Sequence, residues 1–315
     1  MSQRLRQMSF SELYSMYDSS TDDLEKKRIH EAVIAKAERE SISDRSIGNE
    51  STFQPYPHYT NPEFQDILFQ KKEFNANQLF LDSTGIQNSC RLDFSIQAHQ
   101  NFLKNFMTKE SPYHSLLVYH GVGVGKTCSG LTMAENFRDM YARKDRRILI
   151  LCSNNIQIGW KNTIYNPNRG ENQCTGDAFI NSGATTLRET NKLIRQYYEI
   201  MAYQSFSNFV ERMIQQYIQP LPRDEKEQGR IRCIQEYFSD RMMIIDEVHN
   251  IRAEQGGDMR DTVKTIEEVI RYSENLRLLL LTATPMYNRS SEIVWILNMM
   301  LLNDKRPLIQ AETIF

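Results

Sequence analysis

Five short, continuous apolar runs separated by longer amphipathic stretches limit how this 315-residue chain can fold. The runs are SLLVYH (115–120), RILILC (147–152), YEIMAY (198–203), RMMIID (241–246) and LRLLLLTA (276–283). Such runs are typical of strands buried on both faces of a parallel sheet. Stretches such as KTCSGLTMAENFRDMYARK and MRDTVKTIEEVIRYSEN have helical periodicity instead. The alternation predicts an α/β domain whose parallel sheet is flanked by helices.

The sequence divides into three predicted zones. Residues 1–41 form a helical N-terminal extension, in which DLEKKRIHEAVIAKAERE is expected to be a peripheral, mixed-charge helix. Residues 42–61 are polar and contain proline, which predicts a linker. Residues 62–315 hold all five apolar runs and form the predicted α/β domain. Within it, 165–183 and 219–229 have the composition of surface loops or insertions.

Composition excludes some functional classes and leaves others open. No apolar stretch approaches the roughly 18 residues of a membrane-spanning helix, so we expect no membrane partner. The five cysteines are scattered and lack CxxC spacing, which suits a reducing compartment and indicates no metal site. The net charge of −2 argues neither for nor against nucleic acid.

The segment HGVGVGKT (120–127) follows the first predicted strand directly and precedes a predicted helix. In this context glycines allow the backbone to approach phosphates, and the helix N-terminus favours their negative charge. Lys126 can reach the β- and γ-phosphates of a nucleotide, and Thr127 can offer its hydroxyl to Mg²⁺. We therefore expect the nucleotide to contact this whole segment: His120, Gly121, Val122, Gly123, Val124, Gly125, Lys126 and Thr127. His120 departs from the general pattern, which has glycine there, and an ordinary glycine-rich turn is the alternative.

Two adjacent acids end the fourth predicted strand, MMIIDEVHN (242–250). Ligands of open α/β sheets bind at the carboxyl ends of the strands, so these acids are expected near the glycine-rich segment. Asp246 would hold Mg²⁺, and Glu247 would orient and deprotonate the attacking water. Taken alone, an Asp-Glu pair after apolar residues is usually only a strand end.

The DEVH tetrapeptide (246–249) resembles motif II of superfamily 2 helicases, and the glycine-rich segment resembles their motif I. LLLLTATPMYN (278–288) resembles motif III. The resemblance implies a RecA-like ATP-binding domain in which Lys126, Asp246 and Glu247 are catalytic. It also implies that His249, Thr282 and Thr284 couple the nucleotide to the nucleic-acid groove. Without the other motifs, a threonine-containing turn before a proline would be the preferred interpretation of motif III.

Other motifs of the family match this sequence less specifically. Gln100 corresponds to the glutamine that reads adenine, with a solvent-facing helical glutamine as an equal alternative. Two segments lie where family members hold the phosphate backbone of a nucleic-acid strand. The residues expected to make these contacts are Ser153, Asn154, Lys161 and Gln204. Trp160 and Tyr203, beside two of them, are predicted to be core or groove-wall residues.

The sequence around the motifs, from Tyr56 to Phe315, resembles that of ATPases of nucleocytoplasmic large DNA viruses. Within them it resembles the large subunit of the early transcription factor, with nucleoside triphosphatase I as the alternative. The resemblance implies a DNA-dependent ATPase that uses ATP and Mg²⁺ in early transcription, in the virion and host cytoplasm. DNA is the expected partner, with RNA as an alternative. A small transcription-factor subunit and the viral RNA polymerase are further implied partners.

No arginine-rich motif and no second RecA-like lobe follow motif III in this sequence. Because the second lobe supplies an arginine finger in this superfamily, we expect residues 1–315 to be nearly inactive without it. A non-catalytic interaction module that retains the fold is the competing hypothesis. An unrelated P-loop ATPase, such as a transporter component, is a third, and it does not explain DEVH together with TATP.

Overall fold

The computed structural model describes residues 10–20, 56–77, 96–121, 123–143, 146–251, 258–286 and 292–314, with a few positions between Met8 and Ala32 besides. The chain forms two compact units, Met1–Gln78 and Leu79–Phe315. The first unit contains α2 (Phe10–Ser19), α4 (Phe64–Gln70) and α5 (Lys72–Asn75). Most of the expected helix 23–40 and residues 42–55 of the expected linker 42–61 lie outside the described residues, so these zone boundaries stay predictions.

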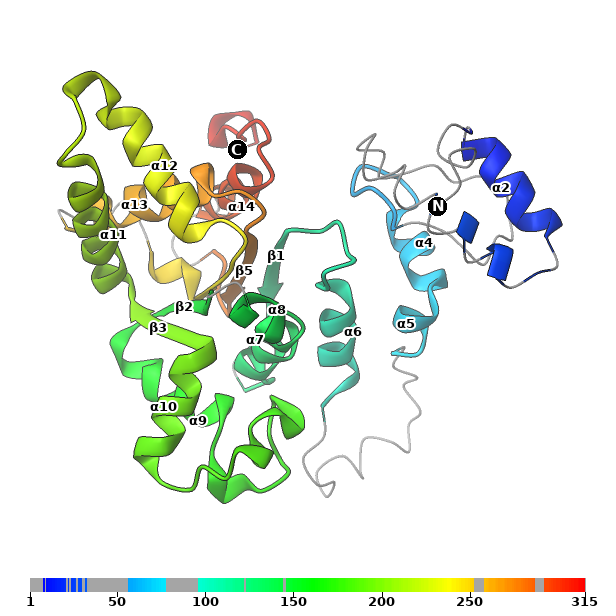
Figure 1. Ribbon diagram of the computed structural model, residues 1–315, viewed down its shortest axis with the longest axis horizontal. Helices are drawn as coiled ribbons and strands as arrows, with labels where there is room; N and C mark the ends of the chain where they lie inside the picture. Colours follow the sequence, from blue (N-terminus) through cyan, green and yellow to red (C-terminus); the bar gives the residue numbers. More distant parts are fainter. Residues whose placement is uncertain are drawn as a thin grey trace. The chain divides into compact units, whose positions relative to one another are not determined.

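The second unit is built on a five-stranded sheet (Figure 1). Its strands are β1 (Ser115–Tyr119), β2 (Ile148–Cys152), β3 (Tyr198–Ala202), β4 (Met242–Asp246) and β5 (Arg277–Thr282). Their order is β1-β5-β4-β2-β3, and every neighbouring pair is parallel. Each strand coincides with one of the five apolar runs to within about one residue at either end. The predicted α/β class with a parallel sheet flanked by helices is confirmed.

Helices cover both faces of this sheet. One face carries α11 (Tyr203–Ile218), α12 (Lys226–Phe238), α13 (Asp258–Tyr272) and α14 (Glu292–Asn303). The other carries α7 (Lys126–Glu135), α8 (Arg138–Arg143), α9 (Gln157–Ile164) and α10 (Leu187–Tyr197), and α6 (Ala98–Phe106) packs on α7. Figure 1 shows the two groups on opposite sides of the strands.

Residues of the central strands alternate between the two hydrophobic cores. Met243 and Ile245 of β4 face α11–α14, whereas Met242 and Ile244 face α7–α10. All four of these side chains are fully buried. This two-sided burial explains why the strands appear in the sequence as unbroken apolar runs instead of alternating patterns.

The long helix predicted after the glycine-rich segment is two helices, α7 and α8. Asn136 separates them, and its side-chain amide donates to the carbonyl oxygens of Lys104 (2.7 Å) and Met107 (2.9 Å). The next residue, Phe137, is completely buried. The break between α7 and α8 therefore allows Asn136 to bond to Lys104 and Met107, which lie far away in the sequence. Local periodicity cannot reveal such contacts.

The prediction of a loop over 219–229 is wrong at its end, because α12 already begins at Lys226. Gly229 lies inside this helix, and a Cβ there would be 2.3 Å from Leu221 Cδ1. Because Gly229 has no side chain, α12 can pack closely against Leu221. The sequence had suggested a turn at this glycine.

The prediction of a surface loop over 165–183 is only partly right. The segment consists of short 3₁₀ turns, but Gln173, Cys174 and Phe179 are buried. Gln173 satisfies its amide by donating to the carbonyl oxygens of Asn166 (2.7 Å) and Gly170 (3.0 Å). Polar side chains that bond to nearby backbone can be buried at little cost, so polarity alone misled the prediction.

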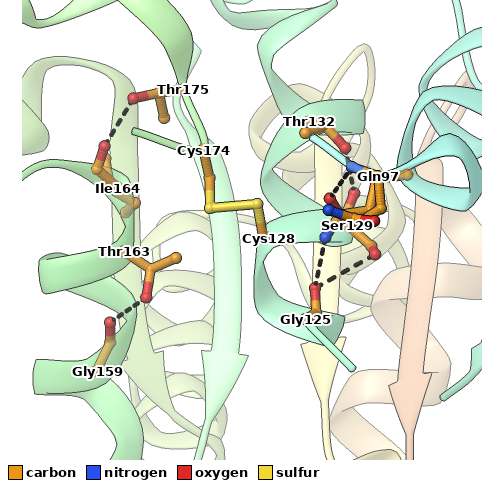
Figure 2. The surroundings of a disulfide bond; sticks show 11 residues. Gln97, Gly125, Cys128, Ser129, Thr132, Gly159, Thr163, Ile164, Cys174 and Thr175 are labelled. Atoms are coloured by element: carbon orange, nitrogen blue, oxygen red, sulfur yellow. Dashed lines mark hydrogen bonds between the residues drawn. A yellow bond between two sulfur atoms is a disulfide. The ribbon is translucent and has the colours of Figure 1, made fainter. Parts of the chain in front are cut away.

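A disulfide joins Cys128 of α7 to Cys174 of this segment, with the two Cα atoms 5.3 Å apart (Figure 2). This distance lies within the usual range for a disulfide. The sequence predicted unpaired cysteines in a reducing compartment. A disulfide between cysteines 46 residues apart leaves no recognisable pattern in the cysteine spacing. Cys152 and Cys233 are free and buried.

Candidate functional site

The glycine-rich segment connects the end of β1 to the start of α7. The His120 backbone N–H donates to the Thr282 carbonyl at 3.1 Å, which fixes the start of the segment against the end of β5. Gly123 and Gly125 have φ angles of +86° and +82°, a conformation that other residues rarely adopt. Gly125 is the N-cap of α7, and Lys126 and Thr127 form its first turn. Val122 lies outside the described residues, and Gly121 and Val124 are exposed.

Gln100 of α6 lies directly against this segment. Its amide nitrogen donates to the Gly125 carbonyl at 3.4 Å, and its amide oxygen accepts from the Gln97 backbone N–H at 2.9 Å. A Cβ on Gly125 would lie 2.7 Å from the Gln100 amide nitrogen, so the two residues are in close contact. Gln100 is buried, in contrast to the solvent-facing alternative, and its adenine contact stays a prediction.

The structure brings Lys126, Asp246 and Glu247 together from segments about 120 residues apart. The Lys126 ammonium forms an ion pair with Glu247 Oε1 and lies 3.9 Å from Asp246 Oδ1. The lysine and aspartate side chains are only 12% and 5% exposed, so their charges interact in a partly desolvated environment. β5 alone separates β1 from β4 in the sheet, and their carboxyl ends therefore meet at one edge.

Three donors hold Asp246 in place. The Trp160 indole N–H donates to Oδ2 at 2.8 Å, and the Glu247 backbone N–H donates to Oδ1 at 2.9 Å. The Tyr203 hydroxyl donates to the Asp246 backbone carbonyl. Burial raises the pKa of Asp246 above its usual value, and the bond from Trp160 and the charge of Lys126 oppose this rise.

Glu247 and His249 lie between Asp246 and the end of β5. Its φ of +50° is unusual for a residue with a side chain, and it starts the 3₁₀ turn Val248–Asn250. The His249 Nδ1 atom lies 3.4 Å from Glu247 Oε2 and 2.8 Å from the Thr282 hydroxyl. Thr282 also accepts from the Thr284 backbone N–H at 3.1 Å. Thr284 thus contacts Thr282 through its backbone N–H, and its own side chain is exposed.

His120 is next to a second imidazole. The rings of His120 and His99 meet edge to face, with centroids 5.3 Å apart. Burial lowers the pKa of His120, and the nearby His99 and Lys126 lower it further. A neutral imidazole is therefore favoured at the start of the glycine-rich segment.

The four residues predicted to contact nucleic acid follow β2 and β3. Ser153 and Asn154 come directly after β2, Lys161 lies on α9, and Gln204 is in the first turn of α11. Gln204 is already engaged within the protein, since it accepts from the Thr262 hydroxyl (2.8 Å) and donates to Asn208 (3.2 Å). All four side chains are at least partly exposed, and their contacts with nucleic acid stay predictions.

Comparison with known families decides what kind of domain this is. The sequence profile of the type III restriction enzyme, res subunit, matches residues 92–287, well over half of the chain. The chain belongs to this family. The matched range of the res-subunit family includes all five strands and every segment of the site described above. The five-stranded parallel sheet with flanking helices is consistent with the predicted RecA-like helicase domain.

Several viral proteins resemble this member of the res-subunit family. "Putative ATP-dependent RNA helicase L377" of Acanthamoeba polyphaga mimivirus is 27% identical over 93% of this chain and 27% of its own length. "Putative helicase 009L" of Frog virus 3 is 24% identical over 66% of this chain and 20% of its own length. "Putative helicase 087L" of Invertebrate iridescent virus 3 is 24% identical over 79% of this chain and 24% of its own length. The chain thus spans about a quarter of the length of these relatives.

The side chains in this res-subunit domain have the chemistry that a magnesium nucleotide requires. Lys126 and the first N–H groups of α7 can neutralise phosphate charge, since a helix N-terminus favours anions. The Thr127 hydroxyl and the carboxylates of Asp246 and Glu247 are the hard oxygen donors that Mg²⁺ prefers. Both acids lie beside Lys126, so phosphate and metal groups can meet at one place.

Among the described helices none combines the length and apolar character that a bilayer crossing demands.

Reasoning from sequence missed the part played by Trp160 and Tyr203. Trp160 was predicted to be core or groove wall, and it is buried, yet its indole also bonds to Asp246. Tyr203 was placed at the end of a strand, but it begins α11 and bonds to the same aspartate. A buried indole N–H or phenol needs a partner, and this requirement was the only available signal.

Proposed function

We propose that this chain is the ATP-binding lobe of a helicase-type motor that acts on nucleic acid. The convergence of Lys126 with Asp246 and Glu247 at the end of the glycine-rich segment carries the proposal. A lysine that reaches phosphates and an adjacent pair of acids are the parts that phosphoryl transfer requires. The three viral relatives, each named as a helicase, support the same class.

In the proposed reaction each residue has a definite task. The N–H groups around Gly123 and Gly125 and the Lys126 ammonium bind the phosphates, while Thr127 and Asp246 hold Mg²⁺. When bound, Mg²⁺ neutralises charge on the phosphate oxygens. Glu247 orients the attacking water and takes its proton. Nucleotide binding draws Lys126 away from Glu247, which frees the carboxylate for this role.

The coupling and recognition roles belong to the same proposal. His249 and Thr282 connect Glu247 to the end of β5, so a change at the phosphates can reach the segment after Thr284. Ser153, Asn154, Lys161 and Gln204 contact the nucleic-acid backbone, and Gln100 reads the adenine base. For Gln100 this requires that its amide exchange its present partners for the base.

We further propose that the motor acts in viral early transcription, in the virion and host cytoplasm, with a small transcription-factor subunit and the viral RNA polymerase as partners. DNA is the proposed substrate, and the RNA helicase name of the mimivirus relative keeps RNA as the alternative. A termination ATPase similar to nucleoside triphosphatase I is the second candidate role. A second RecA-like lobe supplies the arginine finger in this proposal, and residues 1–315 alone hydrolyse ATP only slowly.

Substitution of Lys126 by alanine in the full-length protein tests the proposal. We expect Lys126→Ala to weaken binding of a fluorescent ATP analogue and to lower the ATPase rate, measured with and without nucleic acid, by at least about 100-fold. Lys192→Ala, an exposed lysine on α10, is the matched control and is expected to change both less than about twofold. A non-catalytic interaction module would retain its function in both variants, and equal rates in the two would refute the motor.

A further inference from the structure

Two buried aromatic residues hold Asp246 from two different helices. Trp160 is only 1% exposed, and its indole N–H donates to Asp246 Oδ2 at 2.8 Å. Tyr203 is 6% exposed and donates its hydroxyl to the Asp246 backbone carbonyl. One bond fixes the carboxylate and the other fixes the backbone at the end of β4.

The bond from Trp160 selects the orientation of the carboxylate. With Oδ2 bound to the indole, Oδ1 faces the Glu247 backbone N–H and the Lys126 ammonium. Oδ1 therefore keeps its remaining lone pair on the side of the Lys126 ammonium, where it could bind a metal ion. Partners of this kind orient a metal-binding carboxylate without touching the metal.

Each aromatic residue is next in sequence to a predicted nucleic-acid contact. Trp160 precedes Lys161 on α9, and Tyr203 precedes Gln204 at the start of α11. A nucleic-acid strand that pulls on Lys161 or Gln204 therefore also pulls on a hydrogen bond to Asp246. No other described side chain donates to Asp246 through a hydrogen bond reported in the structure.

We propose that Trp160 and Tyr203 are positioning residues that fix Asp246 for Mg²⁺ and connect it to the two nucleic-acid-binding segments. This inference rests on the function proposed above. The connection gives a direct physical route by which a bound strand changes the geometry of the metal-binding acid. The alternative is that both aromatic residues only fill space between the sheet and the helices.

The first experiment compares two tryptophans that make the same type of bond. In the full-length protein, Trp160→Phe removes the indole N–H and keeps most of the buried volume. Trp295→Phe removes an indole N–H that donates to Glu267 at 2.8 Å, away from Asp246. Binding of a fluorescent ADP analogue is titrated with Mg²⁺ in each variant. We expect Trp160→Phe to raise the Mg²⁺ midpoint by about tenfold and Trp295→Phe by less than about twofold.

The second experiment makes the same comparison for two tyrosines. It measures how strongly bound nucleic acid changes the rate of ATP hydrolysis. Tyr203→Phe is compared with Tyr165→Phe, whose hydroxyl also donates to a backbone carbonyl, that of Ala184, at 3.2 Å. The readout is the ratio of the ATPase rate with single-stranded nucleic acid to the rate without it. We expect Tyr203→Phe to lower this ratio at least about threefold and Tyr165→Phe to leave it unchanged. An unchanged ratio in Tyr203→Phe would overturn the coupling, even if Mg²⁺ binding is altered.

Fluorescence provides a readout that does not depend on activity. This readout uses residues 1–315, which contain two tryptophans, so Trp295→Phe leaves Trp160 as the sole indole of that chain. We expect its emission to change when Mg²⁺ and ADP bind, whereas the emission of Trp160→Phe, which reports Trp295, stays constant. Equal responses in the two variants, or equal Mg²⁺ midpoints, would overturn the positioning role.

The outcomes separate this inference from the proposed function. Wild-type protein that binds no magnesium nucleotide would refute both. Wild-type protein that binds and hydrolyses ATP, with Trp160→Phe and Tyr203→Phe matching their controls, would refute the inference alone. If Trp160→Phe fails to fold by circular dichroism, Tyr203→Phe, which loses a single hydroxyl, still decides the question.

Discussion

Breaking the disulfide between Cys128 and Cys174 should lower the stability of the second unit substantially. The two cysteines are 46 residues apart, so the bond closes a long loop in the unfolded chain. Loop-closure entropy for that separation is about 13.5 cal/mol/K, or about 4 kcal/mol at 25 °C. The bond also attaches the buried segment around Cys174 to α7, whose first turn carries Lys126. A loss of this size is a large part of the stability of an ordinary domain.

Urea unfolding followed by circular dichroism measures this loss. Oxidised wild-type protein is compared with the same protein in dithiothreitol, and we expect the free energy of unfolding to fall by about 4 kcal/mol. The slope should rise, because the reduced unfolded chain is less compact and exposes more surface. Cys174→Ser should unfold at the lower midpoint with or without dithiothreitol, which controls for effects of the reductant. A wild-type midpoint that does not respond to dithiothreitol, or a Cys174→Ser midpoint equal to that of the oxidised protein, would refute the reasoning.

Three further substitutions test how local surroundings set stability. Glu135 is largely buried and accepts a hydrogen bond from the Tyr198 hydroxyl. Burial raises its pKa to about 7, so between pH 4.5 and 7 the folded state holds a proton that the unfolded state has released. Stability should therefore fall as the pH rises from 4.5 to 7, by up to about 3 kcal/mol, and urea unfolding of Glu135→Gln should show a flatter pH dependence. Gly159→Ala, on α9 with open space around its Cβ, should stabilise the protein by about 0.5–1 kcal/mol in the same assay. Gly229→Ala should destabilise it by about 1–3 kcal/mol, because the new methyl group would meet Leu221.

The sheet could be predicted from the sequence because its signal is local. Each strand is an unbroken apolar run, and each is found where its run predicts it. The meeting of Lys126 with Asp246 and Glu247 could also be anticipated. A parallel sheet brings the carboxyl ends of its strands to one edge, and both segments follow such ends.

Contacts between distant residues could not be predicted in this way. The bond from Trp160 to Asp246 joins residues 86 positions apart, and no periodicity records it. The same holds for the cysteine pair and for the side chain of Asn136, which divides the helix after the glycine-rich segment. The position of Gln100 against Gly125 likewise depends on how α6 packs on α7.

The backbone at Glu247 has a consequence for how this site can change. A non-glycine residue with a φ of +50° raises the energy of the folded state by about 1 kcal/mol or more, and glycine would relieve that strain. The role proposed for the Glu247 carboxylate therefore carries a cost in the free energy of folding. Attempts to make the domain more heat-resistant by consensus-style substitution should therefore leave this residue untouched.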